Sequence, residues 1–213
     1  MAKTTAVEMS NVSNDAKEAI EATIPYIAEF EVSGSAPLLF HKWSCEEVEA
    51  KATAAKGSKA KKTDNIEAYL YRTDDGLLAI PGEYFRMSLI GAAKFRQDPR
   101  SPRKSAMDLF KAGVASFDEL CVVKSENGST MREPQFIDRR RVVVQRNAIT
   151  RSRPALFKGW NCKVQLQILL PEYITPQIVN EVFQYAGRIV GVGDFRPSFG
   201  RFNVTGFKVV ELS

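Results

Sequence analysis

The sequence predicts an α+β protein whose core strands and helices follow the order β, α, β, β, α, β. Two observations favour this order. In residues 26–32 and 163–170, apolar side chains alternate with polar ones, which is the period of a strand with one buried face. In residues 83–95 and 176–189, apolar side chains recur at helical spacing. A length of 213 residues suits one domain with a full core, and the sequence contains no internal repeat.

The N-terminal third is expected to contain a tail, a strand and an insertion. Residues 1–24 are polar and lack sustained periodicity, so we expect a flexible tail before the strand at 26–32. Residues 44–79 form the insertion. Within it, 46–63 is rich in Ala, Lys and Glu and cannot fill a core, whereas Asp74-Asp75-Gly76 is typical of a hairpin turn.

The first helix is expected at 83–95, after the turn at Pro81-Gly82. Two prolines in 98–104 interrupt the helical geometry, because proline lacks a donor and restricts the residue before it. We expect a loop there, followed by a second helical piece at 105–112 that ends at Gly113.

Three further strands are expected at 114–123, 135–145 and 163–170. A polar loop at 126–129 separates the first two of them.

The chain is expected to end with a helix and a strand. Thr175 and Pro176 are a typical helix start, and the helix at 176–189 is followed by the last strand, 202–211. Taken together, the elements predict a ferredoxin-like (RRM-type) βαββαβ core with a long β-hairpin. It would occupy one domain, 25–213, with insertions at about 44–79 and 124–160.

The charge is distributed unevenly along the chain. Residues 1–85 carry 9 Lys and Arg against 14 Asp and Glu, whereas the remainder carries 21 against 11. A basic C-terminal part is typical of a protein with a polyanionic partner, because neutralised phosphates release condensed counterions. The alternative is a solvated basic face without a ligand.

Composition also argues against several classes of protein. No apolar run is long enough for a membrane span and the N-terminus is polar, so we expect a cytoplasmic protein without a membrane partner. Three widely spaced cysteines and one histidine form no metal-binding pattern. We therefore expect neither a metal nor another cofactor.

The strongest candidate for a binding segment is 139–158, which holds seven basic residues and no acid. Arginine dominates, and its planar guanidinium can bind phosphate oxygens in pairs or stack on bases. Aromatic residues nearby, including Phe157, could stack on unpaired bases. The alternative is a solvated hairpin with one charged face. The candidates in and after this segment are Arg139, Arg140, Arg141, Arg146, Arg151, Arg153, Lys158 and Trp160.

Two further segments could contact phosphates. The first runs from the end of the first helix through the proline-containing loop, and its candidates are Arg86, Lys94, Arg96, Arg100, Arg103 and Lys104. Some of these cations could instead complement the helix dipole. The second segment is the glycine-rich stretch before the last strand, with Arg196, Arg201 and the glycines Gly191, Gly193 and Gly200. The glycines would let the backbone approach a ligand, and two of Phe195, Phe199 and Phe202 are expected in the core.

Short motifs along the chain resemble the RAMP superfamily, specifically the Cas7-like backbone proteins of CRISPR effector complexes. These motifs are Leu38-Leu39-Phe40, Ile80-Pro81-Gly82, Leu89-Ile90-Gly91-Ala92-Ala93 and the glycine-rich loop 191–201. The resemblance implies an RRM-like palm, an RNA-binding groove and side-by-side polymerisation along a guide. The hairpin after Phe136 would then correspond to the thumb that separates bound nucleotides, in a CRISPR subunit or a divergent phage-borne relative.

The sequence therefore predicts a non-catalytic protein that binds single-stranded RNA or DNA as a homo-oligomer or filament, with other effector-complex subunits as further partners. One alternative is a RAMP-type endoribonuclease, for which His41 is a weak candidate as general acid or base. A second is a two-metal nuclease using Asp74, Asp75, Asp118, Glu119, Asp138 and Asp194. A phage structural or assembly protein is the third.

Overall fold

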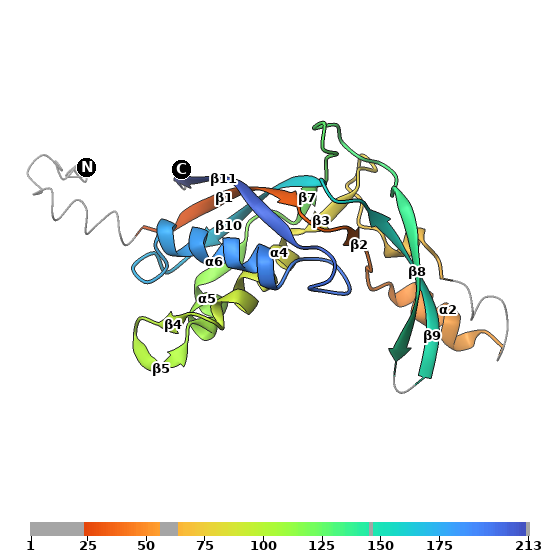
Figure 1. Cartoon of the computed structure of the whole chain (residues 1–213), viewed down its shortest axis with the longest axis horizontal. Coiled ribbons are helices and arrows are strands. Elements are labelled where there is room, and N and C mark those ends of the chain that lie inside the picture. Colours follow the sequence, from red (N-terminus) through yellow and green to blue (C-terminus); the bar gives the residue numbers. More distant parts are fainter. Residues whose placement is uncertain (1–23, 56–63, 145–146, 212–213) are drawn as a thin grey trace, which may run out of the picture.

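A computed structural model describes residues 24–55, 64–144 and 147–211 of the chain. Its largest sheet has four strands in the order β11-β1-β10-β6, and each neighbouring pair is antiparallel (Figure 1). The central strand β1 pairs with β10 over its whole length and with β11 on its other side. The strands are β1 (Tyr26–Gly34), β6 (Val114–Ser116), β10 (Asn161–Ile168) and β11 (Phe202–Glu211).

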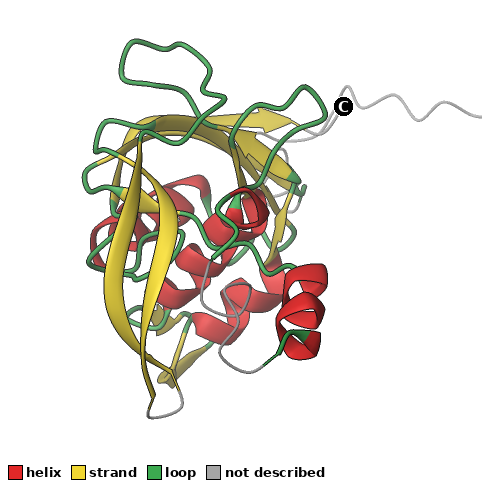
Figure 2. Cartoon of the chain, turned by 90° about the vertical axis from the view of Figure 1, so that its right-hand side faces the viewer, coloured by secondary structure: helices red, strands yellow, loops and turns green. Residues whose placement is uncertain are grey.

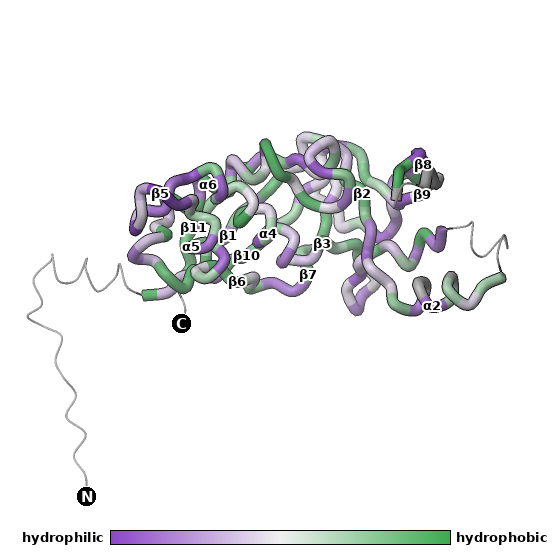
Figure 3. Tube along the Cα trace, turned by 90° about the horizontal axis from the view of Figure 1, so that it is seen from below, coloured by the Kyte–Doolittle hydropathy of each residue, from purple (hydrophilic) through white to green (hydrophobic). Residues whose placement is uncertain are grey.

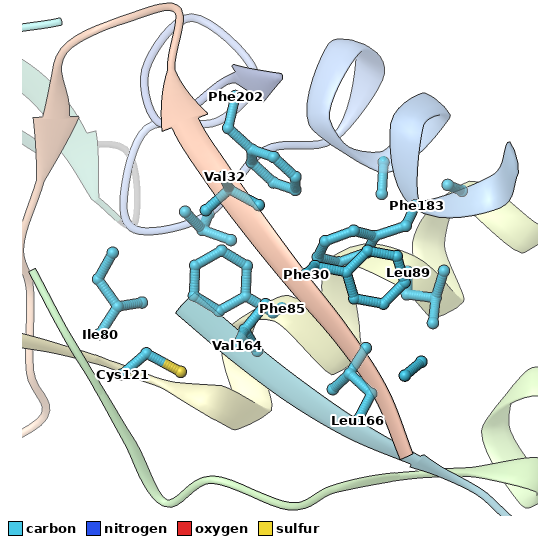
Figure 4. Close-up of a cluster of buried hydrophobic side chains, with 14 of the residues drawn as sticks. Phe30, Val32, Ile80, Phe85, Leu89, Cys121, Val164, Leu166, Phe183 and Phe202 are labelled. Carbon is cyan, nitrogen blue, oxygen red and sulfur yellow. The ribbon is translucent and has the colours of Figure 1, made fainter. Parts of the chain in front are cut away.

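Helices pack against one face of this sheet, where α4 contacts β10 and β6 while α6 contacts β11 and α4. Aromatic side chains fill the space between sheet and helices, as Figure 4 shows. The Phe30 ring lies 4.1 Å from that of Phe183, and the Phe85 ring lies 5.7 Å from that of Phe202. Each fully buried ring stabilises the fold by about 1.5–3 kcal/mol. The helices are α4 (Gly82–Ala93), α5 (Met107–Gly113) and α6 (Pro176–Ile189).

The start of α6 follows from its sequence. The Thr175 side chain accepts a hydrogen bond from the Ile178 backbone N–H at 3.4 Å, and Pro176 occupies the first turn. Proline fits there because its missing N–H would have no helical partner in any case. The expected helix start is therefore confirmed.

A long hairpin projects beside the core, and Figure 2 shows it as a two-stranded ribbon at the edge of the molecule. It belongs to a three-stranded sheet with the order β2-β9-β8. Only the base of the hairpin pairs with β2, because β2 has two residues. The strands are β2 (Leu38–Leu39), β8 (Phe136–Val144) and β9 (Asn147–Leu156).

Smaller elements complete the described part of the chain. Strand β3 pairs with β7, and β4 pairs with β5. None of the described helices is long and apolar enough to cross a membrane. The elements are α2 (Cys45–Thr53), the 3-10 helix η1 (Glu67–Tyr69), β3 (Ala79–Pro81), β4 (Gln97–Asp98), β5 (Ser101–Ser105) and β7 (Leu120–Val122).

The expected α+β class is confirmed, and several elements differ in detail. The strand expected at 114–123 is divided between two sheets, because β6 pairs with β10 and β7 pairs with β3. The loop expected at 98–104 forms most of a small hairpin, β4–β5. The tail expected at 1–24 lies almost wholly outside the described residues.

Candidate nucleic-acid interface

The hairpin presents two different faces. Strand β8 pairs with β9 in unbroken register from Phe136 opposite Ala155 to Val144 opposite Asn147. Side chains of consecutive strand residues point to opposite sides. In β8, Ile137, Arg139, Arg141 and Val143 are exposed, whereas the residues between them are half-buried. The arginine triplet is therefore split, with two members on the exposed outer face and Arg140 on the inner face.

Arg140 holds the hairpin against the glycine-rich loop. Its Nε and Nη2 donate to the two carboxylate oxygens of Asp138, each at 2.6 Å. Its guanidinium carbon also lies 4.8 Å from the centre of the Phe195 ring and 4.4 Å from that of Phe199. Such cation–π contacts orient an arginine that a carboxylate has already neutralised. Arg140 thus connects the hairpin to the glycine-rich loop through contacts within the chain.

A buried ion pair makes a second contact between hairpin and loop. Arg153 in β9 is buried, and its Nε contacts the Oδ2 of Asp194. Asp194 also accepts a hydrogen bond from the Phe195 N–H at 2.8 Å, which fixes its carboxylate. A buried guanidinium is tolerated only when a charge of opposite sign compensates it. The Arg153–Asp194 pair therefore fixes the position of the hairpin.

The third contact involves the segment just before η1. Asp64 accepts hydrogen bonds from the Arg151 side chain at 3.0 Å and from the Ser152 backbone N–H at 2.8 Å. The Tyr69 hydroxyl also donates to this carboxylate, at 2.9 Å. Arg151 is therefore paired as well. Sequence reasoning missed Asp64, which lies in the insertion and more than 80 residues before its partners.

These contacts leave a smaller set of cations for a ligand. Within the described ranges, five candidates of the hairpin and the glycine-rich loop are exposed and make no ion pair: Arg139, Arg141, Lys158, Arg196 and Arg201. Arg139 and Arg141 lie on the outer face of the hairpin, and Arg196 belongs to the loop that packs against its inner face. Free cations thus lie on both sides of the ribbon. Arg146 lies outside the described residues.

The basic segment from α4 to β5, with candidates from Arg86 to Lys104, is not part of this surface. Strands β4 and β5 lie at one end of the molecule and the β8–β9 hairpin at the other (Figures 1 and 3). Helix α4 separates them, and its 12 residues span about 18 Å. This basic segment therefore does not share a surface with the hairpin and the glycine-rich loop.

Several cations of that segment are paired internally. Arg96 contacts Glu181 at 2.9 Å, and Arg100 forms an ion pair with Asp98 at 2.8 Å. Arg86 donates to Glu83 and to the backbone carbonyls of Val114 and Lys111, so it joins α4 to the end of α5. Within the described part of the chain, the exposed candidates of this segment without an ion pair are Lys94, Arg103 and Lys104.

The glycines of the loop lie close to the backbone of other parts of this chain. A Cβ on Gly200 would lie 1.7 Å from the Val192 carbonyl oxygen, and one on Gly193 would lie 2.6 Å from the Leu39 carbonyl oxygen. Both residues have positive φ, at 70° and 76°, which glycine adopts without strain. Gly191 has the same conformation and would meet Gly200. The close backbone approach expected for a ligand is thus used inside the loop.

Trp160 is a core residue. It is 2% exposed, and its Nε1 donates to the Ala36 carbonyl at 3.0 Å. Its indole fills the space beside Gly34, so it is not available to stack on a base. Phe157 is 54% exposed and stacks on Phe136 at 4.6 Å, which makes it the accessible ring at the base of the hairpin.

The phenylalanines of the glycine-rich loop have different environments. Phe202 is fully buried, Phe199 is half-buried, and Phe195 is 42% exposed. Phe195 also has a φ of 58°, which is unusual for a bulky residue. The packing of the loop on Arg140 holds it in this conformation.

Two adjoining pockets border the loop. The smaller, of about 270 Å³, is lined by His41, Tyr84, Met87, Gly193, Asp194 and Arg196. The larger, of about 630 Å³, shares four of these residues and extends along Ile189, Phe195 and Pro197. Sequence reasoning did not identify Tyr84 or Met87, which lie on α4. His41 was considered only as a weak catalytic candidate.

His41 occupies a polar but half-enclosed position. Its Nδ1 lies 3.5 Å from Asp194 Oδ2, and its ring packs edge-to-face on Tyr69 at 4.8 Å. Burial lowers the pKa of the imidazole below its usual value; Asp194 opposes this shift, and Arg153 adds to it. The neutral form of His41 is therefore favoured.

The acids proposed for a two-metal nuclease do not gather in one place. Among the residues that the structure describes, no three His, Cys, Asp or Glu side chains are grouped to hold a metal ion. Asp138 and Asp194 are instead paired with arginines.

The open face of the four-stranded sheet carries a different ionic cluster. Glu29 is 4% exposed, and its carboxylate contacts Lys163 at 2.5 Å, Lys208 at 2.9 Å and the Gln165 amide at 2.6 Å. Burial alone would raise the pKa of Glu29, but these partners lower the pKa to about 2. RRM-type recognition stacks bases on aromatic side chains of this face. The centre of the face is ionic in this protein.

No protein-family model matches the sequence, and no curated protein matches it. Solved structures with a similar fold include a chain from the Type III-B Cmr-beta complex bound to cognate target RNA, with 10% identity and a TM-score of 0.46. The match covers 93% of this chain, which spans only 65% of the length of that chain.

Two further solved structures are similar. Cmr6 from Pyrococcus furiosus has 10% identity and a TM-score of 0.46, over 85% of this chain and 98% of that one. Csc2 from Thermofilum pendens has 12% identity and a TM-score of 0.33, over 95% of this chain and 72% of that one. All three matches are likenesses in structure at low sequence identity.

Proposed function

We propose that this chain binds single-stranded nucleic acid, RNA in particular, across its long hairpin, as a non-catalytic subunit that lies beside copies of itself along the strand. The main support is that some hairpin arginines form ion pairs within the chain whereas others are exposed and unpaired among the described residues. Arg140, Arg151 and Arg153 are neutralised by carboxylates and dock the hairpin. Arg139 and Arg141 remain exposed and without ion pairs in the described part of the chain.

A fixed hairpin with free cations suits a flexible polyanion. The internal ion pairs already hold the hairpin in place. Binding therefore does not have to order the hairpin, and the entropy cost of ordering does not reduce the affinity. The loop that packs against the inner face of the hairpin adds positive charge through Arg196. A single-stranded nucleic acid that crosses the free edge of β8 would therefore meet guanidinium groups on both faces of the hairpin. This path requires bending that single strands allow and duplexes resist.

Exposed aromatic rings favour an unpaired strand. Phe157 and Phe195 are 54% and 42% exposed, beside Lys158 and Arg196 respectively. A base can stack on such a ring only when it is not enclosed in a duplex. RNA, and assembly with other subunits of a ribonucleoprotein, are the partners implied by the resemblance in sequence.

The proposed scaffold for this surface is a ferredoxin-like core in a single domain. In chain order, β1, β6, β10 and β11 are the first to fourth strands of the main sheet, so its spatial order is four, one, three, two. Helix α4 connects the first strand to the second, and α6 connects the third to the fourth. This arrangement supports the split βαβ assignment.

A salt titration tests the function. Binding of the purified protein to three fluorescent probes would be measured from about 50 to 300 mM salt, over which electrostatic screening increases strongly. The probes are a single-stranded RNA, a single-stranded DNA of the same sequence, and a duplex. If all five unpaired cations contact phosphates, log Kd should change with log salt with a slope of about 3.5 for the single strands. Equal affinity for the duplex, or affinity that does not depend on salt, would contradict the proposal.

The contact between His41 and Asp194 favours one alternative, an endoribonuclease with His41 as general base. The same RNA, incubated with the protein and analysed for cleavage products, separates the two. Cleavage that is lost in His41→Ala would replace the non-catalytic proposal.

A further inference from the structure

We propose that the smaller pocket beside His41 binds one unpaired base of the strand, with Arg196 holding a phosphate of the same nucleotide. This inference rests on the proposed function and deepens it, because it assigns a pocket to one base, in addition to the phosphate contacts and the exposed rings. Its basis is the combination of a pocket, two flat aromatic rings and a free guanidinium in one place.

The lining suits a planar heterocycle. His41 and Tyr84 contribute aromatic rings, and Met87 contributes a flexible apolar side chain. Aromatic rings and methionine are surfaces on which every base can stack. A volume of about 270 Å³ is large enough for one base.

The groups that would recognise the base are held in place beforehand. The residues on either side of His41 are fixed by backbone hydrogen bonds, from Phe40 N–H to the Pro154 carbonyl and from Lys42 N–H to the Tyr69 carbonyl, each at 3.0 Å. Tyr84 is held by a hydrogen bond of 2.9 Å between its hydroxyl and that of Tyr71. Groups that are already ordered lose little entropy on binding, so a small pocket of this kind can contribute measurably to affinity.

His41 also offers a polar contact. Its Nδ1 faces the Asp194 carboxylate, so Nε2 is the nitrogen left for a ligand. A neutral imidazole that donates through Nδ1 accepts through Nε2. The base would therefore present a donor to this nitrogen, such as an exocyclic amino group or a ring N–H.

Asp194 does not exclude a nucleotide from the pocket, because its charge is compensated by the buried guanidinium of Arg153. Arg196 lines both pockets, is exposed and makes no ion pair with any described residue. A phosphate at Arg196 would place one nucleotide in the smaller pocket. The larger pocket, with Ile189, Phe195 and Pro197, leaves room for its neighbour.

The test compares natural oligonucleotides with abasic ones of equal length and charge. The wild-type protein and His41→Ala would be titrated with both, at fixed salt. We expect His41→Ala to weaken binding of the natural strand by about five-fold or more and to leave the abasic strand unchanged, because stacking on the ring is lost only where a base is present. A Tyr84→Leu variant should give the same pattern.

Arg139→Ala/Arg141→Ala is the matched control, because these residues lie on the outer face of the hairpin and do not line the pocket, so the change should weaken both strands equally. Thermal unfolding of each variant checks that it is folded. A His41→Ala effect that is equal for natural and abasic strands, or absent for both, overturns the pocket while salt-dependent strand binding remains intact. Loss of all strand binding by the wild-type protein would instead overturn the proposed function together with the pocket.

A free nucleotide has the same chemistry as a base within a strand, and a competition experiment separates them. AMP, CMP, GMP and UMP would be added to the complex with the natural strand. We expect displacement only far above the strand concentration, since a mononucleotide lacks the phosphate contacts of the hairpin. Mononucleotide binding that is as tight as strand binding and depends on His41 would show that the pocket serves a free nucleotide, and would overturn the inference.

Discussion

Arg139 and Arg140 are adjacent in the chain, yet they lie on opposite faces of the hairpin and have opposite environments. Arg139 is exposed and has no ion pair within the described ranges, whereas Arg140 forms two hydrogen bonds to Asp138 and covers the rings of Phe195 and Phe199. Strand alternation therefore exposes one guanidinium to solvent and places the other against the glycine-rich loop.

The outer-face arginines should control affinity. We expect Arg139→Ala/Arg141→Ala to weaken binding to all single-stranded sequences and to reduce the slope of log Kd against log salt by about 1.4. The melting temperature should stay within about 1 °C, because neither side chain has a partner among the described residues. Fluorescence anisotropy and thermal unfolding measure the two quantities. Unchanged salt dependence would exclude these arginines from phosphate contact.

The inner-face arginine should control the position of the hairpin. We expect Arg140→Ala to increase amide hydrogen exchange in 136–156, because the hairpin loses its contacts with Phe195 and Phe199. Any loss of affinity should be smaller than in the outer-face variant and should leave the salt slope almost unchanged. Exchange that stays at the wild-type level would show that Arg140 is not needed for docking.

Removal of the Asp194 carboxylate should destabilise the protein. Asp194→Asn leaves the buried Arg153 guanidinium without a compensating charge, and we expect the free energy of unfolding to fall by about 2–4 kcal/mol. Denaturant unfolding measures this loss. Glu83→Gln is the control, because its partner Arg86 retains two backbone carbonyl acceptors, and its effect should be below about 1 kcal/mol. A loss for Asp194→Asn no larger than the control would contradict the role of the buried pair.

The cluster around Glu29 should make stability depend on pH. Because the pKa of Glu29 is about 2 in the folded protein and near 4.5 ordinarily, its ion pairs stabilise the fold at neutral pH, and this contribution declines as the pH falls from about 4.5 towards 2. We expect Glu29→Gln to cost about 1–3 kcal/mol at pH 7 and progressively less below pH 4. The exposed Glu31→Gln, on the same strand, is the control. A cost for Glu29→Gln that is independent of pH would exclude an ionic origin.

Regular periodicity predicted the core well, because burial of one face imposes a pattern that the sequence displays directly. The strands β1, β10 and β11 and the helices α4 and α6 lie where alternation or helical spacing placed them. The start of α6 was also predictable, since Thr175 and Pro176 act on residues beside them in the chain. Such signals are local and do not depend on tertiary contacts.

The candidate site was less predictable, because its character depends on contacts between distant residues. Arg151 meets Asp64 and Arg153 meets Asp194 only after folding, so the density of arginine overstated the charge available to a ligand. Trp160 was expected at a binding surface, but its indole fills the space beside Gly34. Strand alternation alone places Arg140 on the opposite face from Arg139 and Arg141. The sequence does not show which of these two faces packs against the glycine-rich loop.

Strand β8 pairs with β9 on one side and with no other described strand on the other, which leaves an open sheet edge. Open edges attract strands from other molecules, and charged side chains are a common protection against such association. Arg139 and Arg141 provide that protection while they repel a like-charged neighbour. Under the proposed function, a bound nucleic acid would cancel this repulsion, and copies of this protein would then associate through β8 only along a shared nucleic acid.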